Sequence, residues 1–237
     1  YSGRVVVLLP QFEAAAWIET VQKHSVTHAF LVPTMLARVM EADNFSKTAF
    51  EGMDGITYGA APMPPSVIRR AISVFPENVS FAGAYGQTET TSTVAVLDPD
   101  DHRVEGNEAE KALKLKRLSS VGKVLDDVEV RIVDEAGLPV ELEVLGEVQL
   151  RTFRAMDGYW GNDEKTRITV DNEGWVHTGD LGYLDIDDYV KFAVLRNPFD
   201  QLISLYNQLR KQSDIPSLDY FILGDKNLTM KNVDHYI

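Results

Sequence analysis

Short apolar runs alternate with helically spaced segments in the first third of the chain. The run at residues 5–9 is continuously apolar, as is the run at residues 29–32, and each is followed by a proline. Two further runs of strand length lie at residues 56–59 and 79–85. Short continuous runs of this kind are typical of buried parallel strands. The pattern therefore predicts four strands in this part of the chain.

The segments between these runs have the character of helices. Residues 13–24 place apolar side chains at helical spacing, and Thr34 is suited to cap a helix that continues to about residue 40. Two prolines precede residues 66–75, and prolines suit the first turn of a helix. Alternation of strands and helices predicts an α/β fold, with a parallel sheet and flanking helices.

The pattern changes after residue 98. Residues 98–117 are charged and mostly non-periodic, which predicts a surface loop with a helical turn. Residues 128–133 and 146–151 alternate with period two, and residues 134–137 have turn composition. Later segments, at residues 175–177, 181–184 and 189–190, continue this strand pattern. We therefore predict a smaller, antiparallel or barrel-like β subdomain.

The end of the chain differs from the rest in charge. The last 47 residues hold 6 basic and 5 acidic residues, whereas the whole chain holds 23 basic and 36 acidic residues. A shift of this kind indicates a boundary near residue 190. We predict an α/β part at 1–120, a β subdomain at 121–190, and a short strand-helix tail within 191–237.

Composition excludes several classes of protein. The absence of cysteine excludes disulfides and fits a reducing compartment, so we expect a cytoplasmic location. No apolar run approaches the roughly 20 residues of a membrane-spanning helix. The net charge of −13 argues against binding to nucleic acid. The five histidines lack the spacing of a transition-metal site.

A compact set of chemical groups follows the strand at residues 79–85. Tyr85 can stack on a base, and Gly86 lets backbone approach a ligand. Thr88 can bond a phosphate, and Glu89 can hold the Mg²⁺ that accompanies phosphates. The position after a strand places these groups at the sheet edge where ligands bind. The alternative is an aromatic strand end followed by a polar turn, and it stays open for this motif alone.

Two further segments contain groups that suit a nucleotide. The small residues Gly59, Ala60 and Ala61 follow another strand, and a flat ring can lie against their backbone. Asp180, in residues 177–180, can accept two hydrogen bonds from a ribose diol. The alternative is that the Thr-Gly-Asp triplet is a hairpin turn between two strands. We expect Glu147 to be solvated or bonded to a turn, without a chemical role.

Together these motifs resemble the AMP-forming adenylating superfamily, the acyl-CoA synthetases and their relatives. The resemblance covers residues 3–190, with matches at residues 58–62, 85–89, 146–148, 158–160 and 175–182. The implied reaction activates a carboxylic acid with ATP to form acyl-AMP and pyrophosphate, and then transfers the acyl group to the thiol of CoA. The loop at residues 101–103 is similar to that of members acting on fatty acids.

The resemblance also implies roles for individual residues. Tyr85 and Gly86, with the backbone of residues 59–61, would line the adenine. Thr88 would contact the AMP phosphate and Glu89 would bind Mg²⁺, so these two residues would be catalytic. Asp180 would bind the ribose hydroxyls. The implied ligands are ATP or AMP, Mg²⁺, CoA and a carboxylic acid, expected to be a fatty acid.

Several parts of the resembled family have no counterpart in the sequence. These parts are the phosphate loop, the hinge, and the C-terminal domain with its catalytic lysine. We therefore expect a piece of a longer chain with little or no adenylating activity of its own. Uncovered apolar surface would favour self-association. A catalytically dead module that binds adenylate or a partner protein remains an alternative.

Residues 191–237 resemble a fragment of a carbohydrate-type sulfotransferase. That family binds the 3′-phosphate of the sulfate donor with an Arg-x-Pro-(x)5-Ser pattern, which Arg196, Pro198 and Ser204 match. Gln201 departs from the pattern, since arginine is common at that position. Arg196 and Ser204 would thus bind a nucleotide phosphate. A sulfotransferase-like fusion is a third alternative, although the loop for the 5′-phosphosulfate and the catalytic base are both absent.

Overall fold

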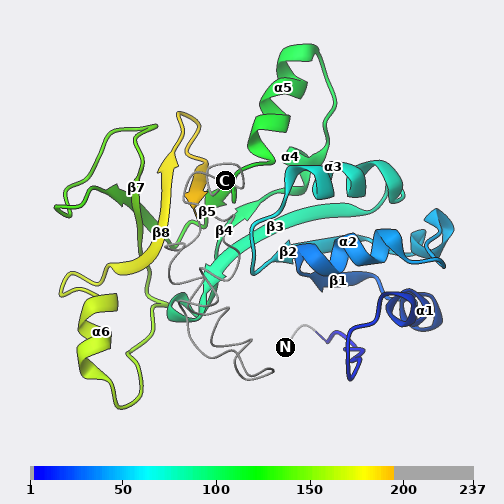
Figure 1. Ribbon diagram of the computed structural model, residues 1–237, viewed down its shortest axis with the longest axis horizontal. Coiled ribbons are helices and arrows are strands. Elements are labelled where there is room, and N and C mark those ends of the chain that lie inside the picture. Colours follow the sequence, from blue (N-terminus) through cyan, green and yellow to red (C-terminus); the bar gives the residue numbers. More distant parts are fainter. Residues whose placement is uncertain (1–2, 195–237) are drawn as a thin grey trace, which may run out of the picture. The chain divides into compact units, whose positions relative to one another are not determined.

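The computed structural model describes residues 3–194, and residues up to Ala193 belong to one compact unit (Figure 1). Its first sheet, sheet A, has five strands in the order in which they occur along the chain. These strands are β1 (His28–Leu31), β2 (Gly55–Gly59), β3 (Ser80–Gln87), β4 (Ser92–Leu97) and β5 (Lys123–Val124). β1, β2 and β3 are parallel, as predicted, whereas β4 and β5 run antiparallel to their neighbours. The α/β class is confirmed, with a mixed sheet in place of a wholly parallel one.

Three helices cover one face of this sheet, namely α1 (Ala14–His24), α2 (Pro33–Glu41) and α3 (Pro65–Val74). α1 packs on α2, and α2 packs on α3. Their core contacts include Ile18, Leu36 and Ile68, each with no exposed surface, packed with Ile56 and Phe81 of the strands. Right-handed crossovers between consecutive parallel strands place α2 and α3 on the same face.

The ends of these helices follow local chemistry. Both carboxylate oxygens of Glu13 accept backbone N–H groups at the start of α1, from Ala15 and Ala16. The prediction that Thr34 caps α2 is wrong. The cap position is Val32, without a side-chain hydrogen bond, and Pro33 is the first helical residue. The fixed φ angle of proline suits this first position without a capping hydroxyl.

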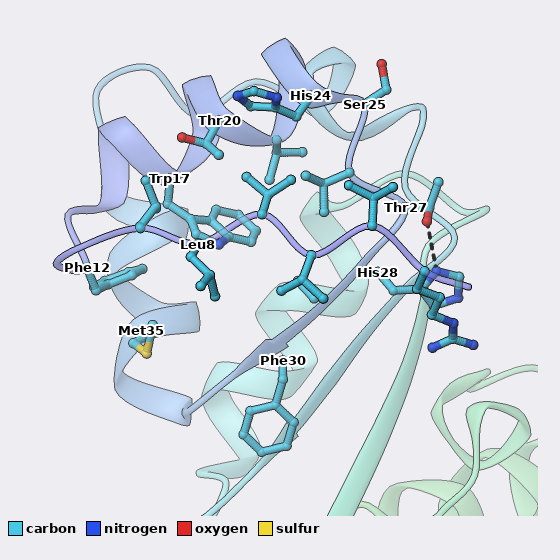
Figure 2. Close-up of a pocket in the computed structure, with 18 residues that line it drawn as sticks. Leu8, Phe12, Trp17, Thr20, His24, Ser25, Thr27, His28, Phe30 and Met35 are labelled. Atoms are coloured by element: carbon cyan, nitrogen blue, oxygen red, sulfur yellow. Dashed lines mark hydrogen bonds between the residues drawn. The ribbon is translucent and has the colours of Figure 1, made fainter. Parts of the chain in front are cut away.

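The strand predicted at residues 5–9 does not form. A strand needs a neighbour for its backbone groups, and no described strand pairs with this run. Its side chains are exposed instead, Val5 at 91% and Leu8 at 82%. The run borders an open hollow of about 690 Å³ beside α1 and β1, where Figure 2 shows Leu8 and Trp17. None of Thr88, Glu89 and Asp180 lines this hollow, so it is separate from the nucleotide motifs.

Residues 98–117 contain more helix than the predicted loop with a helical turn. They form α4 (Pro99–His102) and α5 (Glu108–Arg117). Asn107 accepts backbone N–H groups at the start of α5, while the side chain of Glu110 accepts the N–H of Asn107. This reciprocal capping stabilises a helix whose hydrophobic periodicity is weak. α5 buries no residue and stands out from the rest of the unit in Figure 1.

α4 carries two buried polar residues that hold several elements together. The hydroxyl of Tyr58 lies 2.8 Å from Nε2 of His102, and Nδ1 of His102 lies 2.8 Å from the carbonyl oxygen of Asp98. A carbonyl only accepts, so Nδ1 carries the proton and Nε2 accepts from Tyr58. Asp101 accepts hydrogen bonds from Tyr189 at 2.9 Å and from Arg117 at 3.2 Å. Asp101 and His102 therefore stabilise the fold through buried hydrogen bonds.

The free energy of unfolding is expected to fall as the pH drops from 7 to 5.5, partly through His102. Burial lowers the pKa of His102 below its ordinary value, against the opposing effects of Asp98 and Asp101. The unfolded chain therefore binds the proton first, and the contribution, complete above about pH 6.5, is lost at lower pH. Urea unfolding at several pH values tests this. His102→Asn is expected to flatten the slope, and an equal slope in both proteins would contradict the assignment.

The second sheet, sheet B, is antiparallel and follows in the chain. Its strands are β6 (Glu129–Val133), β7 (Gly146–Arg151), β8 (Val176–Leu184) and β9 (Val190–Val194). The predicted antiparallel β subdomain is thus confirmed as an element of the fold. Val94 of β4 packs in one core with Val148, Leu150 and Val190 of sheet B. This shared core joins sheet B to the β4 end of sheet A. No helix among residues 3–194 has both the length and the apolar character needed to span a bilayer.

Candidate functional site

Two of the predicted site residues meet although they lie 95 positions apart in the sequence. The hydroxyl of Tyr85, on β3 of sheet A, donates a hydrogen bond to Oδ2 of Asp180, on β8 of sheet B, at 2.7 Å. Asp180 is only 7% exposed. A buried carboxylate needs hydrogen-bonding partners, and this contact supplies one of them. The contact places an aromatic ring and a carboxylate at the junction of the two sheets.

Asp180 is held by a bulge and not by a hairpin turn. Residues 176–184 form one continuous strand, so the alternative of a turn between two strands is wrong. Between the pairs Glu147–Leu181 and Gln149–His177, β8 has three residues where β7 has one. Gly179 has a φ of 70°, which a residue with a side chain rarely adopts. The bulge turns Asp180 to the buried face of sheet B.

Thr88 and Glu89 lie together in a single helical turn, η2 (Thr88–Thr90), directly after β3. Thr88 is exposed, whereas Glu89 is half-buried. Oε1 of Glu89 accepts a hydrogen bond from the hydroxyl of Tyr159 at 2.6 Å. Its carbonyl oxygen accepts the N–H of Met156 at 2.8 Å. The turn therefore places the exposed hydroxyl of Thr88 next to the Glu89 carboxylate, whose position Tyr159 fixes.

Gln87 connects this turn to β3. Its side chain accepts the backbone N–H of Thr90, which is buried. The side-chain nitrogen Nε2 of Gln87 is also buried, and it has no hydrogen-bond partner among the described residues. Buried donors without a partner are rare in folded proteins.

The small residues after β2 lie beside β3, as the parallel sheet requires. Gly59 pairs with Ala84, and a Cβ at Gly59 would collide with the carbonyl oxygen of Ala84. Ala60 and Ala61 are exposed, and Ala60 has a φ of 64°. Their backbone is therefore accessible at the carboxyl edge of β2, next to Tyr85 on the neighbouring strand.

Gly86→Ala is expected to destabilise the fold. A Cβ at this position would overlap the carbonyl oxygen of Ser92 on β4, which is backbone and cannot move without breaking the β3–β4 pairing. Such overpacking costs about 3 kcal/mol of unfolding free energy. Gly52→Ala is the matched control, since a Cβ there meets no atom within 4 Å. Urea unfolding of both variants measures the difference, and equal midpoints would contradict the prediction.

Two residues with clear contacts in the site were missed by the sequence reasoning. Tyr159 lay in a matching segment but was given no role, and it contacts Glu89 while the ammonium of Lys165 lies 4.5 Å from its ring centre. Glu147 was expected to be solvated or bonded to a turn. It accepts the backbone N–H of Gly179 at 3.1 Å, inside the bulge that carries Asp180. Neither contact has a local sequence signal, because each joins distant segments.

The oxygen ligands near Thr88 and Glu89 suit a hard cation that arrives together with a phosphate. No group of three or more His, Cys, Asp or Glu side chains suited to a metal occurs in the part of the chain that the structure describes. Glu89 offers a carboxylate oxygen in the same turn as Thr88. Mg²⁺ at phosphates commonly takes one or two carboxylates and keeps water and phosphate oxygens as its other ligands. A single glutamate therefore suits Mg²⁺ that arrives with a nucleotide.

The remaining predicted nucleotide contacts, Arg196 and Ser204, lie outside the described residues. Their proposed binding of a 3′-phosphate therefore stays a prediction.

Comparison with known proteins agrees with the motifs. The model of the AMP-binding enzyme family matches residues 1–160. A probable CoA ligase of Humulus lupulus is 30% identical over 192 residues, which are 80% of this chain and 32% of the relative. A fatty acid–[acyl-carrier-protein] ligase of Streptomyces coeruleorubidus is 30% identical over 189 residues, 80% of this chain and 34% of the relative. The chain spans about a third of the length of these relatives.

Two solved structures are similar to this chain in fold. An amide bond synthetase from Marinactinospora thermotolerans aligns with a TM-score of 0.68 and 29% identity, over 79% of this chain and 35% of the other. An o-succinylbenzoate CoA synthetase from Bacillus subtilis, in complex with ATP and a magnesium ion, aligns with a TM-score of 0.62 and 26% identity. That alignment covers 77% of this chain and 34% of the other.

Proposed function

The chain belongs to the AMP-binding enzyme family, and from this premise we propose that it forms part of the ATP site of an AMP-forming acid–thiol ligase. The observation that carries the proposal is the hydrogen bond between Tyr85 and Asp180. It joins a ring able to pack against a base with a carboxylate able to accept both hydroxyls of a ribose. Thr88 and Glu89 follow Tyr85 within four residues, where the phosphate of the same nucleotide would lie.

Each residue then has a separate task. Tyr85 and the exposed backbone of residues 59–61 hold the adenine, while Gly86 keeps β3 close to β4. Asp180 accepts the ribose hydroxyls, and Thr88 donates to the α-phosphate. Glu89, whose carboxylate is oriented by Tyr159, would hold Mg²⁺. Mg²⁺ when bound would stabilise negative charge on the phosphate oxygens as a carboxylate attacks.

The acid substrate is proposed only as a carboxylic acid transferred to CoA, with fatty acids as the first group to test. The relatives named above include ligases for a fatty acid and for o-succinylbenzoate. The similarity to fatty-acyl members rested on residues 101–103. Asp101 and His102 are buried and form hydrogen bonds with Tyr189 and Tyr58. These contacts within the fold explain why the two residues are present. They carry no information on the acid.

Binding measurements on the purified chain test the proposed function. We expect saturable binding of AMP by isothermal titration calorimetry with Mg²⁺ present. The analogue 2′,3′-dideoxy-AMP, which has no hydroxyls for Asp180, is expected to bind at least about tenfold more weakly. Absence of AMP binding would overturn the proposal. Since the chain spans about a third of its relatives, we expect no carboxylate-dependent exchange of pyrophosphate into ATP.

The alternatives make different predictions in the same assay. A catalytically dead adenylate-binding module would bind AMP but would remain inactive even when combined with the parts of the relatives that lie outside the aligned residues. A sulfotransferase-like function would favour 3′-phosphoadenosine 5′-phosphate, with loss of binding in Arg196→Ala. We also propose the division into parts at 1–120, 121–190 and 191–237, and a cytoplasmic location. Limited proteolysis and cell fractionation test these two points.

We also propose that the isolated chain self-associates through the apolar run at residues 5–8. Val6 is 74% exposed, and Phe30 on the edge strand β1 is 55% exposed beside the same hollow. Exposed apolar surface next to an unpaired strand edge favours association between copies. Light scattering is expected to show oligomers that Val6→Lys reduces, with Leu138→Lys, at another exposed position, as the control. A monodisperse monomer would contradict this proposal.

A further inference from the structure

A side chain on the opposite face of sheet B forms a hydrogen bond with the bulge that carries Asp180. Along β8, the residues that face the core are Thr178, Asp180 and Gly182, whereas Gly179 faces outward and is exposed. On the outer face, Oε1 of Glu147 accepts the N–H of Gly179 at 3.1 Å. On the inner face, the hydroxyl of Thr178 donates to the carbonyl oxygen of Val148 at 2.6 Å. Two side-chain hydrogen bonds thus fix a segment that has left the regular ladder.

Glu147 is itself held in place by neighbouring side chains. Its Oε2 accepts a hydrogen bond from the amide nitrogen of Gln149 at 2.9 Å and lies 3.2 Å from Nδ1 of His177. Gln149 is 1% exposed, and its amide oxygen accepts a hydrogen bond from Nε of Arg131 at 2.8 Å. Oε2 of Glu147 therefore contacts Gln149 and His177, while Oε1 binds the backbone of the bulge.

We propose that Glu147 is a positioning residue for the nucleotide site, acting through Gly179 on Asp180. The inference rests on the proposed function, in which Asp180 binds the ribose hydroxyls. Gly179 adopts a left-handed conformation that glycine does not hold on its own, because glycine is the most flexible residue. Without Glu147, the exposed N–H of Gly179 would turn to water and the bulge would sample other conformations. Asp180 would then lose its fixed orientation toward Tyr85.

Nucleotide binding separates this role from a general effect on folding. Glu147→Ala is expected to weaken AMP binding about tenfold, as for loss of one hydrogen bond to a charged group. Binding of 2′,3′-dideoxy-AMP, which cannot use Asp180, is expected to stay unchanged. Glu147→Gln keeps an oxygen acceptor and is expected to restore most of the affinity. The control is Glu141→Ala, at an exposed position on the loop before β7.

A double-mutant cycle tests whether Glu147 acts through Asp180. If it does, Glu147→Ala combined with Asp180→Ala binds AMP no more weakly than Asp180→Ala alone, because the positioned group has been removed. Additive losses from the two substitutions would overturn the proposal. An equal loss for AMP and the dideoxy analogue in Glu147→Ala would also overturn it, since this would indicate a general disturbance of the site.

Amide exchange at Gly179 gives a readout that does not depend on AMP. In ¹H–¹⁵N spectra, the Gly179 amide is expected to exchange with solvent faster in Glu147→Ala than in the wild type, and to be protected again in Glu147→Gln. Unchanged exchange would overturn the proposal whatever the nucleotide data show. A wild type that fails to bind AMP, with faster exchange in the variant, would overturn the proposed function and leave Glu147 as a structural contact only.

Discussion

Asp180→Ala is expected to lower the affinity for AMP about 100-fold, an effect of two lost charge-assisted hydrogen bonds. The Asp180 carboxylate is buried and already oriented by the Tyr85 hydroxyl at 2.7 Å, so a ribose meets a fixed acceptor. Alanine removes both acceptor oxygens and also leaves the Tyr85 hydroxyl without this partner. Calorimetric titration of AMP into the wild type and the variant measures the difference.

The control for this variant is Asp100→Ala on α4. The Asp100 side chain is 88% exposed and contacts only Arg103, at 3.4 Å among the described ion pairs. It removes the same charge without touching the site, so it corrects for the overall electrostatic field. Thermal unfolding of each protein verifies that the fold is retained. Equal affinity in Asp180→Ala and the wild type would remove Asp180 from the site.

Asp185→Ala is expected to cost about 3–5 kcal/mol of unfolding free energy, the range for breaking a buried ion pair. Asp185 and Lys191 are each 3% exposed, with Nζ of Lys191 3.1 Å from Oδ2 of Asp185. The contact is an ion pair without an aligned hydrogen bond from the ammonium. Oδ1 of Asp185 accepts the N–H groups of Asp187 and Tyr189 at 3.0 Å. Alanine would leave both the turn and a buried ammonium without a partner.

The pKa of Asp185 gives the pH range of this contribution. Burial raises the pKa of its carboxyl. The N–H of Tyr189 and the Lys191 ammonium lower the pKa by more, so it lies below its usual value. The folded state therefore releases the proton more readily than the unfolded chain. The stabilisation is present above about pH 4 and is lost as the pH falls further. Urea unfolding at pH 7 measures its full size.

A second substitution distinguishes the loss of the ion pair from the loss of the turn's hydrogen bonds. Lys191→Met in the Asp185→Ala background removes the buried ammonium and keeps a chain of similar length. Replacement of both partners by apolar groups is often neutral, so the double variant is expected to recover stability relative to Asp185→Ala. If the double variant is no more stable than the single one, the cost comes from the turn at residues 185–189 and not from the charge.

The hydrophobic pattern predicted the elements that neighbouring segments of the chain bury. It failed where strand formation depends on pairing with another strand. The runs that became β2 and β3 are apolar because helices cover them, and their boundaries were close. The run at residues 5–9 is equally apolar, yet it forms no strand among the described residues because strand formation depends on a neighbour. β4 was not foreseen, since its reversal after η2 depends on Thr91 and Ser92 at positive φ, without glycine.

The site shows the same division. Tyr85 and Asp180 were recognised from short motifs, because a ring, a hydroxyl and a carboxylate are chemical types visible in a sequence. Their contact, and those of Glu147 and Tyr159, depend on strand register and on the packing of two sheets. Register between strands 30 or more positions apart leaves no local trace. This is why Glu147 was expected to be solvated or bonded to a turn.

In the proposed site, a nucleotide held by Tyr85 of β3 and Asp180 of β8 would bridge the two sheets. A ligand that contacts both sheets favours only those conformations in which they are packed together. Saturation at 100 times the dissociation constant would add about 2.7 kcal/mol to the stability of the packed form. Substitutions in the shared core, such as Val94→Ala, would therefore weaken affinity without touching the ligand. Ligand affinity and the stability of the contact between the sheets would then be thermodynamically linked.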